Sequence, residues 1–293
     1  MTNPKPGSAN SGRPPLRDVI ARHGLGARRS LGQHFLLDGN LTARIVRVAG
    51  PLIGRHVIEV GPGPGGLTRA LLDSQAATVT AVEIDRRALA AMHELAGESD
   101  HRLRVIEGDA LALDMPGLAP APRQIVANLP YNIATPLLIG WLRHAGAFEQ
   151  LTLMFQQEVA ERICAAPGTA AFGRLSVLSQ WLTEVQLELR IPPAAFIPVP
   201  KIWSAVVRLV PRAVQPGPQL IQTMERLTAA AFGQRRKMLR ATLRPLGGDA
   251  LLAAAAIDGR RRAETLDIGE FDRLVRLLAG QQAIHVSELD GRE

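Results

Sequence analysis

A cluster of glycines, GPGPGG at residues 61–66, separates a short apolar run from a segment with helical spacing. The preceding run, RHVIEV at 55–60, is typical of a buried strand, and GLTRALLDS at 66–74 is typical of a helix. Glycines at such a turn let the backbone approach a ligand without a clashing Cβ, and the first N–H groups of the helix lack intrahelical partners. The cluster therefore predicts a ligand-binding strand–turn–helix unit, with a purely structural tight turn as the alternative.

The same alternation of strand and helix continues along the chain. The predicted strands after the first are 78–84, 102–110, 123–130 and 151–156. Helical segments separate them, so we predict an α/β fold with a mostly parallel, Rossmann-like sheet covered on both faces. Two later strand-like segments, 185–190 and 204–210, have no clear helix between them and predict an antiparallel pair at the edge of the sheet.

Composition shifts divide the chain into domains. Residues 1–21 begin with a stretch rich in Pro, Gly, Ser and Asn and predict a flexible tail. The stretch PRAVQPGPQ at 211–219 is typical of a linker, and the chain after Leu220 has helical spacing. We therefore predict a main domain at 22–212, a small all-helical domain at 213–285 and a C-terminal tail at 286–293.

Charge and cysteine content narrow the classes of function. Cys164 is the only cysteine among 293 residues, which excludes an intrachain disulfide and argues against a Cys-based zinc site; no metal is expected. We expect Cys164 to be a small buried side chain rather than a nucleophile. No secretory h-region and no long apolar run are present, so the expected compartment is the cytoplasm. The net charge of +7 favours a polyanionic partner, nucleic acid first, although many proteins are mildly basic.

Acidic residues stand at the ends of the next two predicted strands. Glu83 lies 22 residues beyond Gly61, where a carboxylate accepts hydrogen bonds from ribose hydroxyls, and Asp109 follows the third strand. Ligands bind at this edge of open α/β sheets, so the pattern predicts a nucleoside cofactor. Glu59 before the glycines gives E-x-G-x-G-x-G, which is similar to S-adenosylmethionine enzymes and favours that cofactor without excluding NAD.

The stretch ANLPYNIATPLL at 127–138 follows the fourth predicted strand and holds Tyr131, the only tyrosine. An exocyclic adenine amine is a poor nucleophile because its lone pair is delocalised. The Asn128 side-chain carbonyl and a backbone carbonyl near Pro130 can each accept one of its N–H groups, which favours a pyramidal nitrogen. Tyr131 can stack on the base. The alternative is an ordinary turn with a partly buried tyrosine.

Four segments together resemble the ribosomal RNA adenine N6-dimethyltransferase family, most closely its bacterial small-subunit members. They are NLPYNIATPLL (128–138), RRSLGQHFLLD (28–38), AAFIPVPKIWSAVVRL (194–209) and AAFGQRRKMLRATL (230–243). The resemblance covers roughly residues 22 to 280 in order. It implies a class I methyltransferase domain at 22–212, an RNA-binding helical domain and S-adenosylmethionine as cofactor.

The resemblance also implies roles for individual residues. It gives cofactor contacts to His34, Leu36, Gly61, Glu83 (ribose), Asp109 (adenine) and Asn128. It gives the reaction site to Asn128, Pro130, Tyr131 and Phe196, with Tyr131 and Phe196 clamping the target adenine. The sequence alone favours a core position for Phe196 equally. Asn is more usual at position 34, so a side-chain contact from His34 is in question, whereas a backbone contact would survive. Ile202 stands where Val is usual, with Trp203 next to it.

A basic stretch, GQRRKMLRATLR at 233–244, is predicted to be helical. Arg236, Arg240 and Arg244 are four residues apart and would share one helical face. Arg235 and Lys237 widen it. We expect these five side chains to contact RNA phosphates, with a solvated amphipathic helix as the alternative.

The resemblance implies dimethylation of N6 on two adjacent adenosines in a hairpin loop near the 3′ end of small-subunit (16S) rRNA, in an assembling 30S particle. A monomer is expected. Three alternatives share some features: a DNA adenine methyltransferase, a large-subunit rRNA methyltransferase and a non-catalytic ribosome-assembly factor. An NAD oxidoreductase is a fourth.

Overall fold

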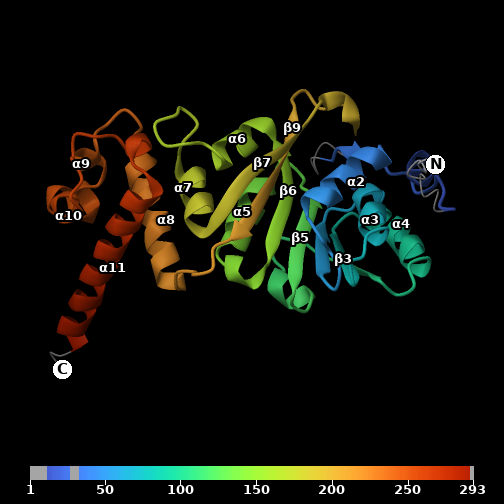
Figure 1. The fold of residues 1–293 in the computed structure, drawn as a ribbon, viewed down its shortest axis with the longest axis horizontal. Helices are drawn as coiled ribbons and strands as arrows, with labels where there is room; N and C mark the ends of the chain where they lie inside the picture. Colours follow the sequence, from blue (N-terminus) through green and yellow to red (C-terminus); the bar gives the residue numbers. More distant parts are fainter. Residues whose placement is uncertain (1–11, 27–32, 291–293) are drawn as a thin grey trace, which may run out of the picture.

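The computed structural model describes residues 12–26 and 33–290, and a seven-stranded sheet lies at its centre (Figure 1). The strand order is β4-β3-β2-β5-β6-β9-β7. The bounds are β2 His56–Val60, β3 Thr78–Glu83, β4 Leu103–Glu107, β5 Arg123–Asn128, β6 Gln150–Gln156, β7 Thr183–Ile191 and β9 Ser204–Pro211. The first five strands in this order, β4, β3, β2, β5 and β6, are parallel to one another, and β9 runs antiparallel to both β6 and β7. The predicted α/β sheet is confirmed, with only β7 of the antiparallel pair at the edge.

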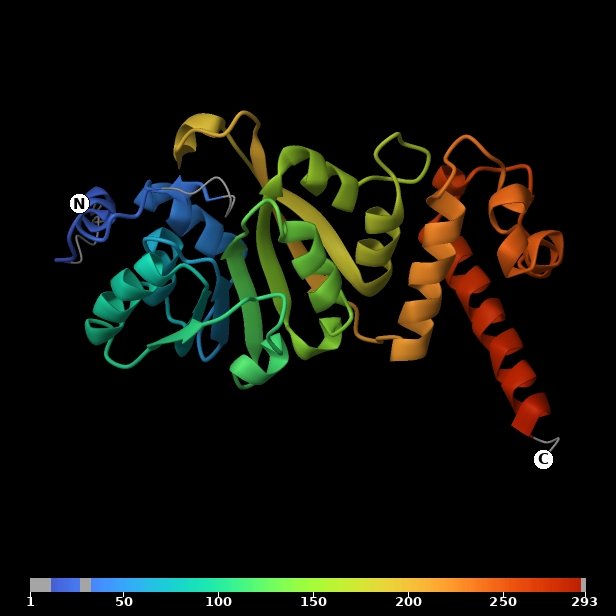
Figure 2. The same cartoon turned by 180° about the vertical axis from the view of Figure 1, so that it is seen from behind.

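Helices cover both faces of the sheet because successive strand residues point in opposite directions. Ile125 and Ala127 belong to one hydrophobic cluster, whereas Val126 between them belongs to another. Helices α2, α3 and α4 supply the second cluster, and α5, α6 and α7 supply the first (Figures 1 and 2). Their bounds are α2 Gly39–Val48, α3 Gly66–Leu72, α4 Arg86–Gly97, α5 Ala134–Leu142, α6 Gln157–Ile163 and α7 Arg174–Leu182.

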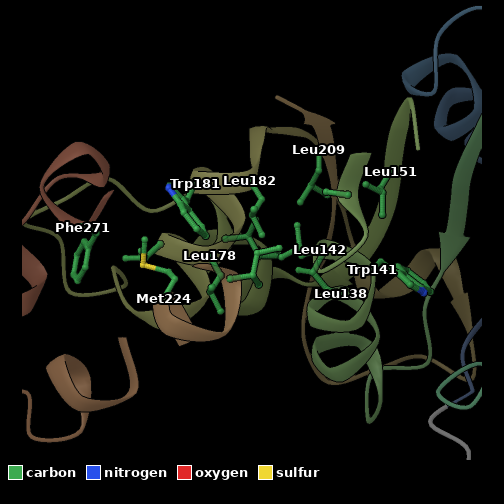
Figure 3. Close-up of a cluster of buried hydrophobic side chains, with 14 of the residues drawn as sticks. Leu138, Trp141, Leu142, Leu151, Leu178, Trp181, Leu182, Leu209, Met224 and Phe271 are labelled. Atoms are coloured by element: carbon green, nitrogen blue, oxygen red, sulfur yellow. The ribbon is translucent and has the colours of Figure 1, made fainter. Parts of the chain in front are cut away.

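The C-terminal helices extend the first cluster rather than forming a separate core. Met224 of α8 and Phe271 of α11 belong to the same cluster as Trp181 and Leu209 (Figure 3). The Trp181 indole N–H also donates to Asp272 at 2.9 Å. The four helices are α8 Pro218–Phe232, α9 Leu239–Thr242, α10 Gly248–Ala254 and α11 Ile268–Asp290. A continuous apolar core therefore joins them to α7.

A small second sheet links two distant segments. Strand β1, Phe35–Leu36, pairs antiparallel with β8, Phe196–Ile197. The pairing was not predicted, because two-residue strands carry no periodic signal. It brings the N-terminal segment beside the loop that precedes β9.

Several element boundaries differ from the predictions. Helix α1, Leu16–Arg22, lies where a flexible tail was expected; its Val19 is buried with Leu25 and Ala88, so packing orders this part of the segment. Residues 1–11 of that tail lie outside the described residues. Helix α11 continues to Asp290, into the expected C-terminal tail. Helix α7 was not predicted. The short 3₁₀ turns are η2 Met115–Leu118, η3 Ala145–Ala147, η4 Pro193–Ala195, η5 Arg244–Leu246 and η6 Ala263–Thr265.

The prediction of one helix through the basic stretch is wrong. Helix α8 ends at Phe232, residues 233–238 form turns, and α9 starts at Leu239. The Leu239 and Arg240 N–H groups donate to the carbonyls of Arg261 and Gly259, at 2.8 and 3.0 Å. These tertiary hydrogen bonds replace the i to i−4 bonds that a continuous helix would need.

Across the described residues, no helix combines the length and apolar character needed to cross a membrane.

Candidate active site

One cavity lies at the carboxyl ends of the central strands. Glu83 and Asn128 are the last residues of β3 and β5, Gly61 follows β2, and Asp109 follows β4. All four line the same cavity. The chain leaves β2 toward β3 on one side, while β5 lies on the other, so this is the switch point where open α/β sheets bind ligands.

The glycine loop, residues 61–66, is in contact with strand β1. Gly61, Gly63 and Gly65 have φ of 69°, 54° and 89°, a region that favours glycine. A Cβ on Gly63 would lie 2.9 Å from the Phe35 ring, and one on Gly66 would collide with the Leu36 carbonyl oxygen. Side chains here would therefore push β1 away from the cavity.

The Glu83 carboxylate is held by backbone donors. Its Oε2 accepts the Gly63 N–H at 3.1 Å, and its Oε1 accepts the N–H groups of Ile84 and Asp85 at 2.9 Å each. Burial raises the pKa of Glu83, and these hydrogen bonds oppose the shift. The carboxylate is thus fixed in orientation at the cavity wall.

Glu59 is a buried acid without a complete set of partners. Its side chain is 1% exposed and lines the cavity, and among the described residues its Oε2 has no hydrogen-bond donor. Burial raises the pKa of Glu59 to about 8; the Thr68 hydroxyl opposes this shift, and the Glu83 charge adds to it. An orphaned buried carboxyl beside a cavity fits a ligand that carries positive charge.

Asp109 completes the acidic wall. Its Oδ1 accepts the Leu111 N–H at 2.9 Å, which orients the carboxylate. Together, Glu83, Asp109 and the orphaned Glu59 oxygen suit a ligand with hydroxyl groups, an amine and a cation. S-adenosylmethionine has all three, so the residues present fit it.

The structure places Asn128 against His34, the residue that precedes strand β1. Its Nδ2 donates to the His34 backbone carbonyl at 3.0 Å. Because this bond fixes the amide nitrogen, Oδ1 is the atom that remains to accept a hydrogen bond from a ligand. The contact involves the backbone of residue 34, so it does not depend on that side chain.

The His34 ring lies beside Tyr131 and Phe196. It stacks on Tyr131 with centroids 5.3 Å apart and contacts Phe196 edge-on at 6.4 Å. Its Nδ1 also contacts the Pro198 carbonyl oxygen at 2.8 Å. Phe196 is fully buried and is not among the residues that line the cavity, whereas His34, Leu36, Pro130 and Tyr131 are.

Two contributors to this site were not identified from sequence. Ser204 Oγ lies 2.5 Å from the Tyr131 hydroxyl, and burial raises the pKa of Tyr131, so the phenol stays neutral. Glu59 begins the E-x-G-x-G-x-G motif, but the motif does not indicate which part of a ligand this side chain would contact. Its unpaired oxygen depends on the tertiary surroundings, which a motif does not report.

The basic residues begin at the turn between α8 and α9, and Arg240 and Arg244 follow in α9 and at the start of η5. Arg236, Lys237, Arg240 and Arg244 are exposed, and no described carboxylate lies within ion-pairing distance of them. Arg235 differs, because its guanidinium donates to the Ala170 carbonyl at 2.7 Å. Of the five predicted RNA contacts, four are therefore unpaired surface cations, and Arg235 also fastens a neighbouring loop.

Sequence comparison matches the chain to known proteins over most of its length. The family model "Ribosomal RNA adenine dimethylase" matches residues 24–280. A protein of Gluconobacter oxydans named "Ribosomal RNA small subunit methyltransferase A" is 60% identical over 94% of this chain and 90% of its own length. One of the same name from Rhodospirillum rubrum is 57% identical over 90% and 92%, respectively.

Solved structures have the same fold. A dimethyladenosine transferase from Plasmodium falciparum superposes with a TM-score of 0.70 at 25% identity, covering 82% of this chain and 96% of that one. The 23S rRNA methyltransferase ErmE gives 0.64 at 27% identity, covering 84% and 99%. The sheet order, the cavity at its carboxyl edge and the match over residues 24–280 lead to one conclusion: the chain belongs to the ribosomal RNA adenine dimethylase family.

Proposed function

We propose that this protein dimethylates N6 of two adjacent adenosines in a hairpin loop near the 3′ end of small-subunit rRNA. As a member of its family, the chain is an S-adenosylmethionine-dependent rRNA adenine dimethyltransferase. The small-subunit target is supported by relatives at 57–60% identity that are named for that subunit, compared with 27% for ErmE.

The position of Asn128 is the observation that carries the proposal. Its side chain stands at the end of β5, lines the same cavity as Glu83 and Asp109, and is fixed by the His34 carbonyl. An amine acceptor is thereby held next to the residues that fit the cofactor. An NAD oxidoreductase has no use for this arrangement.

S-adenosylmethionine supplies an electrophilic methyl group. The protein's task is to present the N6 amine with its lone pair directed at that methyl group. Asn128 Oδ1 accepts one N–H of the amine. The Pro130 carbonyl already accepts the Ile133 N–H at 3.1 Å, so we assign the second contact to the adjacent Leu129 carbonyl. These acceptors stabilise positive charge as it develops on N6. The nitrogen then releases a proton to water.

The cofactor contacts follow from the geometry of the cavity. We assign the ribose to Glu83, the adenine to Asp109, and the cationic end to Glu59 beside the Gly61 turn. Leu36 and the backbone of His34 close the cavity from the N-terminal side.

The target adenine stacks on Tyr131 in this proposal. His34 stacks there in the unliganded protein, so its ring must move aside or become the opposite wall of the base site. Phe196 stays a predicted member of the clamp. In this conformation Phe196 is fully buried and contacts the His34 ring edge-on, so it supports that ring.

RNA binding is assigned to the helical domain, with 22–212 as the catalytic domain and 213–285 as the RNA-binding domain. The four unpaired cations, which extend from the α8–α9 turn to the start of η5, suit phosphate contacts, which position RNA without reading sequence. We place the reaction on an assembling 30S particle in the cytoplasm, since the family's substrate is ribosomal RNA, and we propose that a monomer performs it.

A comparison of substrates tests the proposal. The protein is incubated with labelled cofactor and, separately, unmethylated small subunits, large subunits and duplex DNA. We expect about four methyl groups per small subunit, because two adenosines each accept two. Preferential labelling of large subunits or of DNA would replace the proposed substrate. Particle binding with no labelling would favour the non-catalytic assembly factor.

A further inference from the structure

An exposed tryptophan is next in sequence to Ser204, which contacts Tyr131 of the proposed active site. Trp203 is 47% exposed, whereas Trp141 and Trp181, the other two tryptophans of the chain, are 4% and 8% exposed. Exposing a large aromatic surface to water costs free energy, since its burial would be favourable. The position therefore calls for a partner that covers the ring.

Trp203 lies in an exposed apolar loop. Strand β8 and the loop between β8 and β9 contain Ile197, Val199, Ile202 and Trp203, four of the nine large hydrophobic side chains that are most exposed among the described residues. Ile84 and Leu111, two of the remaining five, line the cofactor cavity. The exposed apolar surface is thus concentrated around the proposed site rather than scattered.

Two contacts hold the chain at Trp203 and Ser204, and the second of them reaches the proposed site. Its carbonyl accepts the Gln157 N–H at 2.9 Å, at the start of α6. The next residue, Ser204, contacts the Tyr131 hydroxyl at 2.5 Å. Trp203 directly precedes β9 and is 47% exposed, so its ring lies at the surface, one residue from the Ser204–Tyr131 contact.

Charge at the same loop favours a nucleic-acid occupant. Lys201 is exposed two residues before Trp203, and no described carboxylate pairs with it. An aromatic ring beside a cation is the combination that binds unpaired nucleotides, the ring for a base and the cation for its phosphate. A protein partner would need a larger continuous apolar face than one ring and a few aliphatic tips.

We propose that Trp203 is a second stacking platform, which holds an unpaired RNA base that neighbours the target adenine. The inference rests on the proposed RNA substrate and extends it: the enzyme grips two bases, one on Tyr131 and one on Trp203. Such a grip explains how a loop nucleotide can be kept out of its own stack while its neighbour is modified.

Steady-state methylation of a hairpin RNA with two adjacent loop adenosines tests the assignment. For Trp203→Ala we expect the KM for RNA to rise about tenfold, which corresponds to about 1.4 kcal/mol, with kcat unchanged. Trp203→Phe keeps a ring and should stay within about threefold of wild type. Val199→Ala is the matched control, because it removes an exposed apolar side chain from the same loop without touching the ring.

Fluorescence supplies a second readout that does not require turnover. Because the other two tryptophans are buried, quenching by the same hairpin RNA reports mainly on Trp203. We expect quenching in wild type and its loss in Trp203→Ala. An unchanged KM in Trp203→Ala together with quenching that persists would overturn the inference. If wild type methylates neither the hairpin RNA nor unmethylated small subunits, the proposed function fails, and quenching still decides whether Trp203 stacks on bases.

Discussion

Glu59 shows how one buried side chain can serve a ligand at a cost to the fold. Its carboxyl lines the cavity, is 1% exposed and has a pKa raised to about 8 by burial. An ionised carboxylate there lacks a full set of hydrogen bonds, which is unfavourable until a cationic ligand arrives. Without a ligand, Glu59 therefore lowers the stability of the fold, and binding of a cationic ligand would offset that cost.

The raised pKa of Glu59 predicts how stability depends on pH. The folded protein holds this proton up to about pH 8, whereas the unfolded chain loses it near its ordinary value of 4.5. Folding therefore binds a proton between these values, and the free energy of unfolding falls as pH rises. Without cofactor, we expect Glu59→Gln to gain about 2–4 kcal/mol relative to wild type between pH 5 and pH 8.

Urea denaturation of both proteins at pH 5 and pH 8 measures this difference. Glu83 is present in both proteins, so its own raised pKa cancels in the comparison. Parallel pH profiles for the two proteins would show that Glu59 ionises normally in the fold.

For individual residues, the sequence predicted which side chains line the cavity better than it predicted the contacts between side chains. Glu83, Asp109 and Asn128 were placed correctly in one cavity, because the ends of parallel strands meet at one edge. The stacking of His34 on Tyr131 was not predicted, and the full burial of Phe196 was only one of two alternatives. Both depend on how two loops, far apart in sequence, pack against each other through β1 and β8.

Among the elements, the start of helix α3 is the most tightly constrained. Gly66 faces the Leu36 carbonyl oxygen, a backbone atom that cannot turn aside. We expect Gly66→Ala to destabilise the protein by about 1–3 kcal/mol, because β1 must shift to admit the methyl group. Cofactor affinity should fall as well, since β1 carries Leu36 at the cavity.

Gly140 in α5 provides the matched control. An added Cβ there meets nothing within 4 Å, and the position is helical. Alanine should stabilise it by about 0.5–1 kcal/mol. Urea unfolding curves of the two variants should move in opposite directions; equal shifts would contradict the assigned contact.

The break between α8 and α9 marks the limit of periodicity as a predictor. Leu239 and Leu243 are fully buried and are four residues apart, as on one face of a helix, yet they do not continue α8. Hydrogen bonds to the 259–261 loop decide the backbone path, and a helical pattern in the sequence carries no information about that loop. The predicted arginine face is consequently a cationic segment through the α8–α9 turn, α9 and the start of η5, here named the cationic turn (Arg236, Lys237, Arg240 and Arg244).

At the scale of the whole molecule, a shared apolar core sets the distance between the two functional regions. The cluster that contains Leu151 of the sheet also contains Phe271 of α11 (Figure 3). The cationic turn and the cavity are therefore held on one framework, which lets phosphate contacts fix where a loop base meets Asn128.

The cationic turn predicts the salt dependence of RNA binding. Arg240→Ala with Arg244→Ala should lower the slope of log affinity against log salt by about 0.7–1 for each lost contact. Arg260→Ala is the control, because this exposed arginine is paired with Asp258 at 3.2 Å. Filter binding at several salt concentrations gives the slopes; an equal decrease for Arg260→Ala would mean that net charge, not the turn, governs binding.

The most direct measurement is nucleoside mass spectrometry of small-subunit rRNA after incubation with the protein and S-adenosylmethionine. Wild type should produce N6,N6-dimethyladenosine at two adjacent loop positions. Asn128→Ala should reduce the rate by about 100-fold or more, because the charge developing on N6 loses an acceptor, while RNA affinity is retained. Dimethyladenosine formed at the wild-type rate by Asn128→Ala, or modification of a different atom by wild type, would contradict the assigned chemistry.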